Sequence, residues 1–229
     1  MNIADAYDFI IKLTANNNRE WFNAHKAEYE QAKTAHEEFI SLLITKIALF
    51  DEDIKGVNVK ECTFRIYRDT RFSPDKTPYK NHLGAYIAAQ GGRNSERAGY
   101  YVHLSPDENF VSGGVYCPQP AILKALRNAI YNNVEEYLAL VNRKDYKQYF
   151  TEFFSDSLKT LPRGYPKDFE HADLLKCRHY SPAAPLPNDM WRMPDCMDEI
   201  VKRLNVLHPY NKFMNFTIDE CLLHIAERN

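Results

Sequence analysis

The sequence predicts an α+β fold, an antiparallel sheet of four or five strands with flanking helices, in a single domain of residues 1–229. Apolar residues recur every three or four positions before Gly56 and again in the second half of the chain, a spacing typical of helices. Between Val59 and Tyr116 the pattern changes to short β-rich runs joined by short turns. Such close spacing favours an antiparallel meander over βαβ crossovers, so we expect the whole sheet in this interval.

The N-terminal region is expected to form two helices. Apolar residues keep a helical spacing over residues 3–11, and the asparagine run that follows suits a helix end and a new N-cap. Glu20 lies three residues after Asn17, as in a capping box. A long amphipathic helix then extends to Ile47, with a bend predicted near Asn23.

The predicted strands begin where the period changes to two. Cys62, Phe64 and Ile66 alternate with residues of different chemistry, which predicts a first strand with a buried thiol at Cys62. Residues 68–81 contain two prolines and no period, so they are expected to form a loop. Three further β-rich runs follow at Leu83 to Ala89, Tyr100 to Leu104 and Phe110 to Tyr116.

The last of these runs contains the unusual triplet Ser112-Gly113-Gly114. Glycine weakens a strand, so the pair predicts a bulge or the close approach of another backbone or of a ligand. A structural close approach is the favoured interpretation. If His103 and Arg65 lie on the same face, these glycines would form the floor of a pocket.

Helical spacing returns after the sheet. Pro118 and Pro120 suit a first helical turn, and an apolar stripe continues over residues 122–134, so we expect a helix that packs on the sheet. The remaining expected elements are a helix from Asp145 to Phe154, a short strand near Leu175 to His179, and a last helix over 197–207 that Pro209 ends.

Charge and composition exclude several classes of function. The formal charge of −2 gives no overall field for nucleic acid, so we expect no general nucleic-acid binding. The longest apolar stretch, residues 39–50, is interrupted by Lys46, and we expect a cytoplasmic protein that does not enter a membrane. The five cysteines form no C-x-x-C pair and the histidines have no ligand spacing, so no metal or cofactor is predicted. Common hydrolase and nucleotide-loop motifs are missing, and no protein partner is identifiable.

The segment from Arg65 to Lys80 is the best candidate site. It has five cations and two carboxylates within a mildly acidic protein. Guanidinium groups form planar forks that suit carboxylate or phosphate, and lysines add point charges. The first hypothesis is therefore binding or turnover of a small anionic or phosphorylated ligand beside the sheet, which leaves open whether the protein is an enzyme. The ligand-binding candidates are Arg65, Arg68, Arg71, Lys76, Tyr79, Lys80 and His103, and no catalytic residue is assigned.

The alternative is that this loop is structural. Asp69 and Asp75 could pair with the arginines and brace the loop, while Tyr67 and Tyr79 pack over guanidinium planes. The protein would then be a non-enzymatic interaction domain, or one whose loop docks an acidic protein partner. On residue types alone the bracing interpretation is favoured, because charged loops are usually solvated or paired internally.

The same loop has the strongest resemblance to a known family. The run from Arg65 to Lys80 resembles the hallmark R-x-x-R-D-x-R-F-[ST]-x-D-K-T-P-Y-K of the DUF2461 family. Residues 100–105 and 112–118 are similar to its second block, and the resemblance extends from about Ile3 to about Phe216. It implies an α+β fold and carries over no activity, substrate or cofactor.

Overall fold

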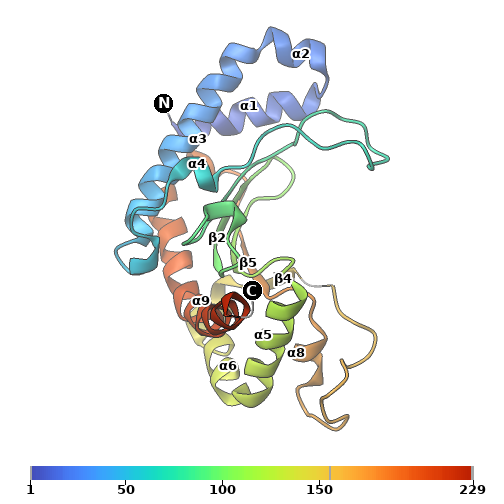
Figure 1. Ribbon diagram of the computed structural model, residues 1–229. Helices are drawn as coiled ribbons and strands as arrows, with labels where there is room; N and C mark the ends of the chain where they lie inside the picture. The colour runs from blue at the N-terminus through green and yellow to red at the C-terminus, as the bar shows by residue number, and fades with distance from the viewer. Residues whose placement is uncertain (1, 155, 228–229) are drawn as a thin grey trace.

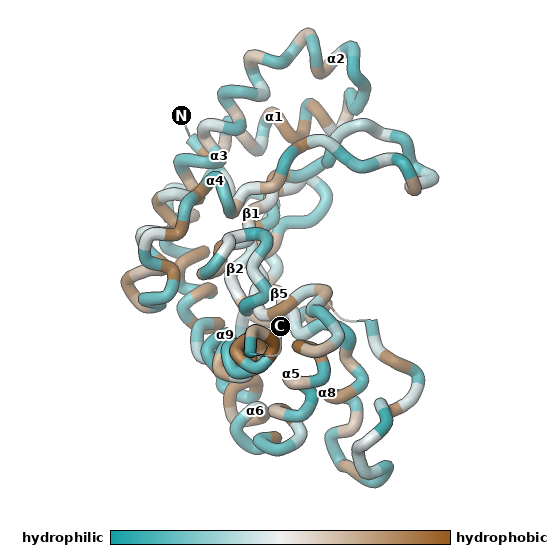
Figure 2. The backbone as a smooth tube through the Cα atoms, in the orientation of Figure 1, coloured by the Kyte–Doolittle hydropathy of each residue, from teal (hydrophilic) through white to brown (hydrophobic). Residues whose placement is uncertain are grey.

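The computed structural model describes residues 2–154 and 156–227. Figure 1 shows α1 and α2 at one end of the molecule and α5, α6 and α8 at the other, with the sheet between them. In Figure 2 hydrophobic and hydrophilic segments alternate along the helices, as expected for helices that bury one face. The helices are α1 (Ile3–Ala15), α2 (Arg19–Ala24), α3 (Lys26–Ile47), α4 (Val59–Cys62), α5 (Pro120–Asn132), α6 (Val134–Val141), α7 (Lys144–Tyr149), α8 (Ala172–Lys176) and α9 (Cys196–Ala226), with short 3₁₀ turns at η1 (Glu52–Ile54), η2 (Gly92–Asn94) and η3 (Met190–Arg192).

The sheet is fully antiparallel and has five strands in the order β1-β2-β3-β5-β4, which confirms the predicted fold class. The expected position of the sheet was only partly correct, because two of its strands come from the second half of the chain. The strands are β1 (Leu83–Ile87), β2 (Gly99–Leu104), β3 (Phe110–Gly114), β4 (Glu152–Phe154) and β5 (Ser181–Pro185).

The two faces of the sheet differ in what covers them. Tyr100, Val102 and Leu104 of β2 are buried on the face that packs against the helices. The Tyr100 hydroxyl donates a hydrogen bond to Asp51 at 2.7 Å. Tyr101 and His103 alternate with these residues and therefore lie on the opposite face, where they line a cavity.

Helix α9 continues past Pro209 to Ala226, so the prediction that this proline ends the helix was wrong. An internal proline costs a helix about 3 kcal/mol. Three side chains beyond it are completely buried, and each contributes about 1.5–3 kcal/mol, which together exceed that cost. Asn211 also binds the sheet, since it accepts a hydrogen bond from the Gly114 amide and donates one to the Gly99 carbonyl. The buried side chains are Tyr210, Met214 and Ile218.

Three other predictions of local structure were wrong or partly wrong. Cys62 is the last residue of α4, and residues 63–66 do not form a strand: Thr63 forms an isolated bridge with Ala85, and the Phe64 amide donates to the Gly84 carbonyl. The expected helix over 145–154 ends at Tyr149, and β4 follows it. The expected strand near residues 175–179 is the end of α8 and a single bridge, while β5 begins at Ser181.

The N-terminal helices follow the prediction with one shift of register. Asn18, not Asn17, caps α2, because its side-chain oxygen accepts a hydrogen bond from the Trp21 amide. The predicted bend corresponds to the break between α2 and α3 at His25. Asn17 is thereby available for the contact with Tyr79 described below.

The glycines of β3 allow a close approach, which was the favoured interpretation. A Cβ atom at Gly113 would lie 2.3 Å from Leu207 of α9, and one at Gly114 would lie 2.0 Å from the Tyr180 carbonyl oxygen. Only glycine allows both neighbours to come this near to the strand. None of the helices in the described part of the chain has the length and apolarity needed to cross a membrane.

Candidate functional site

The segment from Arg65 to Lys80, here called the hallmark loop, folds back on itself as an irregular hairpin. Tyr67 and Tyr79 form a bridge, and backbone hydrogen bonds run from the Arg68 amide to Pro78 and from the Lys80 amide to Ile66. Figure 1 shows the loop projecting from the sheet on the same end as α2. The two arms therefore hold each other in register without a continuous strand.

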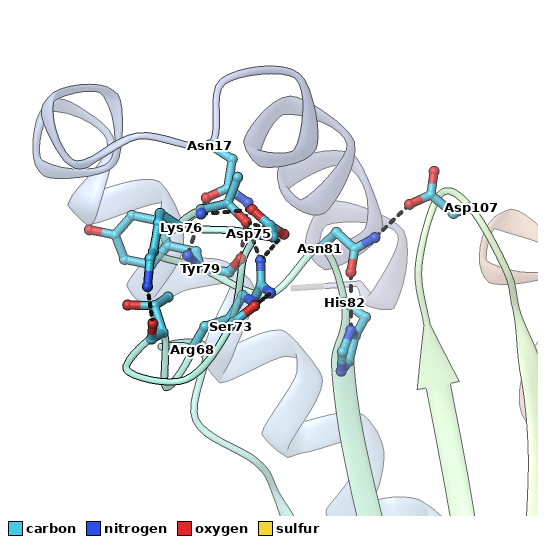
Figure 3. Close-up of polar contacts among 11 residues, drawn as sticks. Asn17, Arg68, Ser73, Asp75, Lys76, Tyr79, Asn81, His82 and Asp107 are labelled. Carbon is cyan, nitrogen blue, oxygen red and sulfur yellow. Dashed lines mark hydrogen bonds and ion pairs between the residues drawn. The ribbon is translucent and has the colours of Figure 1, made fainter.

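Three of the predicted cations, Arg68, Arg71 and Lys76, form hydrogen bonds or ion pairs within the loop, and Figure 3 shows those of Arg68 and Lys76. Arg68 donates to Asp75 and to Thr77, and the Lys76 ammonium group donates to the Thr70 carbonyl at 2.9 Å. Arg71 pairs with Asp69 at 2.6 Å. The two arginine–carboxylate pairs are those that the bracing interpretation expects.

The loop is also fastened to the N-terminal helices. The Asn17 side chain donates to the Tyr79 carbonyl at 3.0 Å and accepts from the Tyr79 amide at 3.2 Å (Figure 3). The Tyr79 ring is stacked on Phe22, with 3.9 Å between ring centroids. A polar cleft of about 740 Å³ lies between the loop and α2, and both Arg68 and Lys76 are on its wall.

Replacing Arg68 with alanine should destabilise the fold in a way that depends on pH. Hydrogen bonds from the Thr77 amide and then from Arg68 lower the pKa of Asp75 to about 2. The stabilisation by this carboxylate is therefore present above about pH 4 and is lost as the pH falls toward 2. We expect Arg68→Ala to lower the melting temperature by about 2–4 °C at pH 7, and less below pH 4.

Thermal melts at several pH values test this expectation, with Arg71→Ala as the matched control. Arg71 forms the same kind of pair with Asp69, but its side chain is 77% exposed, so its loss should leave the melting temperature almost unchanged. Equal melting temperatures for Arg68→Ala and the wild type at pH 7 would contradict the bracing role.

A different site lies on the open face of the sheet, where β1, β2 and β3 border a cavity of about 610 Å³, here called the sheet cavity. Its lining combines aromatic rings with charged side chains, serines and a glycine. The lining includes Phe64, Lys80, His82, Arg93, Glu96, Tyr101, His103, Glu108, Phe110, Ser112, Gly113, Phe154 and Ser181.

Two neighbouring histidines with tilted rings are the central feature of the sheet cavity. The His82 and His103 rings lie 4.3 Å apart between centroids, and His103 is stacked on Phe110 at 4.7 Å with 10° between ring planes. The His103 Nδ1 atom forms a hydrogen bond with the Tyr101 hydroxyl at 2.9 Å. His82 comes from the residue just before β1, and His103 from β2, so the rigid sheet holds both rings.

Both imidazoles are neutral at physiological pH. The pKa of His82 is lowered to about 4, mainly by burial and to a smaller extent by the positive charge of the nearby Lys80. The pKa of His103 is lowered to about 3, mainly by burial and to a smaller extent by electrostatic interaction with His82 and Lys80. Titratable groups with strongly shifted pKa values in a cavity are candidates for function.

Lys80 and Arg93 are cations on the wall of the sheet cavity, and they differ in what holds them. The Lys80 ammonium group lies 5.1 Å from the centroid of the Phe64 ring, and no ion pair holds it within residues 2–154 and 156–227. Burial and then Arg65 lower the pKa of Lys80. Arg93 also lines the cavity, but it donates to the Lys60 and Thr63 carbonyls. Two carboxylates, Glu96 and Glu108, are on the wall as well, so they balance the formal charges of Lys80 and Arg93.

Of the predicted site residues, the structure brings Lys80 and His103 together in the sheet cavity. Arg68, Lys76 and Tyr79 lie instead along the cleft beside α2. Arg65 is exposed and lines neither hollow, so the pocket expected between His103 and Arg65 contains only the histidine.

Sequence reasoning missed His82 and Tyr101. The alternation over residues 100–104 could have placed Tyr101 beside His103, because residues two apart on a strand share a face. His82 carried no such signal, since its position depends on the β1–β2 register, in which Gly84 lies opposite His103.

The other hollows and clusters offer less chemistry. A groove of about 940 Å³ runs between α5 and the end of α9, with walls of alanine, asparagine and exposed aromatic side chains. In the part of the chain that the structure describes, no three His, Cys, Asp or Glu side chains are grouped so that they could hold a metal ion.

Comparison with known proteins places the whole arrangement in one family. No curated protein and no solved structure matches the chain. The model of a family described as "Conserved hypothetical protein (DUF2461)" matches residues 5–213, which is well over half of the 229 residues. The protein therefore belongs to the DUF2461 family.

Proposed function

We propose that the protein binds a small molecule with an anionic group and a planar apolar body in the sheet cavity. The observation that carries this proposal is the position of Lys80, a half-buried cation beside two neutral imidazoles and without an ion-pair partner among residues 2–154 and 156–227. A buried charge without a partner is unfavourable, and a bound carboxylate or phosphate would supply that partner.

The electrostatics of the sheet cavity support an anion at the Lys80 end. Lys80 contributes to the lowered pKa of both His82 and His103, so its field reaches both rings. A negative group placed there would interact with the ammonium ion in surroundings of low dielectric, where the attraction is stronger than in water. The carboxylates of Glu96 and Glu108 would disfavour the same group elsewhere on the wall.

The apolar lining supports a planar body for the rest of the ligand. Phe110 and Phe154 contact each other with ring centroids 5.0 Å apart, and Phe64 contacts Tyr101 at 6.3 Å. Ligand sites are commonly hydrophobic clefts of about 300–1,000 Å³ with a few polar groups, and the sheet cavity fits this description.

A second candidate function is docking of an acidic protein partner by the hallmark loop. Phe72 at this loop is 93% exposed, and the Arg71 guanidinium group lies 5.9 Å from its ring. Exposed aromatic and arginine side chains are common anchors of protein interfaces. The interaction would leave the sheet cavity unaffected, so Phe72→Ser should not change small-molecule binding.

A thermal-shift screen with phosphorylated metabolites, nucleotides, dicarboxylates and aromatic carboxylates tests the proposed function. A ligand that binds only the folded state raises the melting temperature, by an amount set by its concentration relative to Kd. We expect at least one compound to stabilise the wild type, and Arg68→Ala to respond with a shift of the same size from a lower starting temperature. No shift with any compound, or a shift that Arg68→Ala abolishes, would contradict binding in the sheet cavity.

A further inference from the structure

The proton positions of His82 follow from its neighbours. The Asp107 carboxylate accepts a hydrogen bond at 2.5 Å from the Asn81 side-chain nitrogen, because a carboxylate can only accept (Figure 3). The Asn81 oxygen therefore faces His82 Nδ1, 3.2 Å away, and this ring nitrogen has to be the donor. In the neutral ring the proton is then on Nδ1, and Nε2 is a bare acceptor.

His103 has the opposite tautomer. Its Nδ1 atom lies 2.9 Å from the Tyr101 hydroxyl, and a phenol is a stronger donor than a neutral imidazole N–H. Tyr101 therefore donates to Nδ1, and the proton of His103 is on Nε2. Gly84 makes room for this contact, because a Cβ atom there would lie 2.8 Å from the Tyr101 hydroxyl oxygen.

The two rings thus offer an acceptor and a donor next to each other, with centroids 4.3 Å apart. By contrast, the hydroxyl groups of Ser112 and Ser181 already donate hydrogen bonds to backbone carbonyls. Ser112 donates to the Pro182 carbonyl at 2.7 Å, and Ser181 donates to the Gly113 carbonyl at 3.1 Å. The histidine pair is therefore the reactive feature of this site.

We propose that the sheet cavity catalyses keto–enol proton transfer on small carbonyl-containing carboxylates, with His82 as the base and His103 as the hydrogen-bond donor to the carbonyl oxygen. This inference rests on the proposed function, since Lys80 has to hold the carboxylate. The aromatic lining suits substrates with a planar ring, so aromatic α-keto acids are the substrate class.

The step is balanced without any further reagent. His82 Nε2 takes a proton from the carbon next to the carbonyl, the C–H electron pair forms a C=C bond, and the carbonyl π electrons move to oxygen. The resulting enolate oxygen accepts a hydrogen bond from His103 Nε2–H, which does not lose its proton. The imidazolium of His82 then returns the proton to the carbon or delivers it to the enolate oxygen, which gives the enol.

The neutral state of both rings suits these roles. A neutral His82 can accept a proton at physiological pH. A neutral His103 can donate a hydrogen bond to the enolate oxygen and keep its proton, so its ring stays uncharged. Lys80 is one cause of the low pKa of His82, and a bound carboxylate would offset its charge. A bound carboxylate would therefore reduce the contribution of Lys80 to the low pKa of His82, whereas the larger contribution of burial would remain.

The test uses phenylpyruvate as the probe and two readouts on the full chain. Binding is measured as a thermal shift, and proton transfer as the loss of the C3 proton signal by NMR in D₂O at low buffer concentration. We expect the wild type to exchange this proton at least tenfold faster than His82→Gln, while both proteins bind phenylpyruvate. His103→Gln should also slow exchange, and His224→Gln, a control with a side chain 76% exposed at the end of α9, should behave as the wild type.

The outcomes separate this inference from the proposed function. If phenylpyruvate binds but its C3 proton exchanges equally fast with wild type and with His82→Gln, only the inference is overturned. If phenylpyruvate does not bind, the proposed substrate class is overturned. Failure of every compound in the thermal-shift screen overturns the proposed function as well. If His82→Gln does not fold, long-range ¹⁵N NMR of the wild type decides the matter: a proton on His82 Nδ1 supports the assignment, and a proton on its Nε2 refutes it.

Discussion

Replacing Gly114 with alanine is expected to lower the free energy of unfolding by about 3 kcal/mol or more. Gly114 has a φ of +72°, which a residue with a side chain rarely adopts. The added Cβ atom would lie 2.0 Å from the Tyr180 carbonyl oxygen, and that carbonyl accepts the Val115 amide at 2.9 Å. The clash is with backbone, so it cannot be relieved by turning a side chain, and the bridge between β3 and the chain before β5 has to open.

Gly56→Ala is the matched control for this prediction. Gly56 has a similar φ of +82°, but nothing lies within 4 Å of its added Cβ atom. It therefore measures the backbone strain alone, which is about 1–2 kcal/mol. Urea denaturation of both variants gives the comparison, and equal losses of stability would show that the close approach at Gly114 does not matter.

Replacing Lys80 with glutamine is expected to weaken binding of anionic compounds in the sheet cavity by about tenfold to a hundredfold. The glutamine side chain is one bond shorter and can still donate a hydrogen bond, but it lacks the charge that would face the ligand. Because the site is only half-buried, wild-type affinity should also fall as ionic strength rises, and the variant should lose most of this dependence. Calorimetric titration of the strongest compound from the screen measures both effects.

Lys76→Gln is the matched control for Lys80→Gln. Both lysines belong to the hallmark loop, but the Lys76 ammonium group donates to the Thr70 carbonyl on the side of the loop that faces α2. Its removal should change the affinity less than twofold. An equal loss in both variants would indicate that the loop as a whole, and not the sheet cavity, attracts the anion.

Local patterns were sufficient to predict the elements whose environment is set by nearby residues. The strands β1, β2 and β3 coincide closely with the β-rich runs, because alternate residues of a half-covered sheet have to differ in polarity. The start of α5 was indicated by proline at its first turn. The predicted break in the second helix was also correct to within a few residues.

The errors occurred where distant contacts decide the outcome. Pro209 stays inside α9 because the turns that follow it pack on the sheet. The stabilisation from this packing depends on distant residues and is not visible in the local sequence pattern. Residues 150–154 leave α7 and join β5, although their aromatic spacing resembled a helix. Short apolar runs are compatible with either structure, and their pairing partner lies about thirty residues away in the sequence.

The site was predicted in part, for the same reason. Charge clustering pointed to the hallmark loop, but it could not distinguish cations that pair within the loop from Lys80, which extends toward the sheet. The pairing of His82 with His103 depends on strand register, and their neutrality depends on burial. Neither quantity is visible in the spacing of histidines along the chain.

Histidine ring signals offer the most direct test of the claim that the ligand site is the sheet cavity. Protein labelled with ¹³C and ¹⁵N in histidine is titrated with the compound that gives the largest thermal shift, and signals are assigned with His→Gln variants. We predict that the His82 and His103 signals move with the same Kd while those of His25 and His36 stay fixed. Movement of His25, the C-cap residue of α2, whose Arg19 and Asn23 line the cleft beside the hallmark loop, without movement of His82 and His103 would contradict this claim.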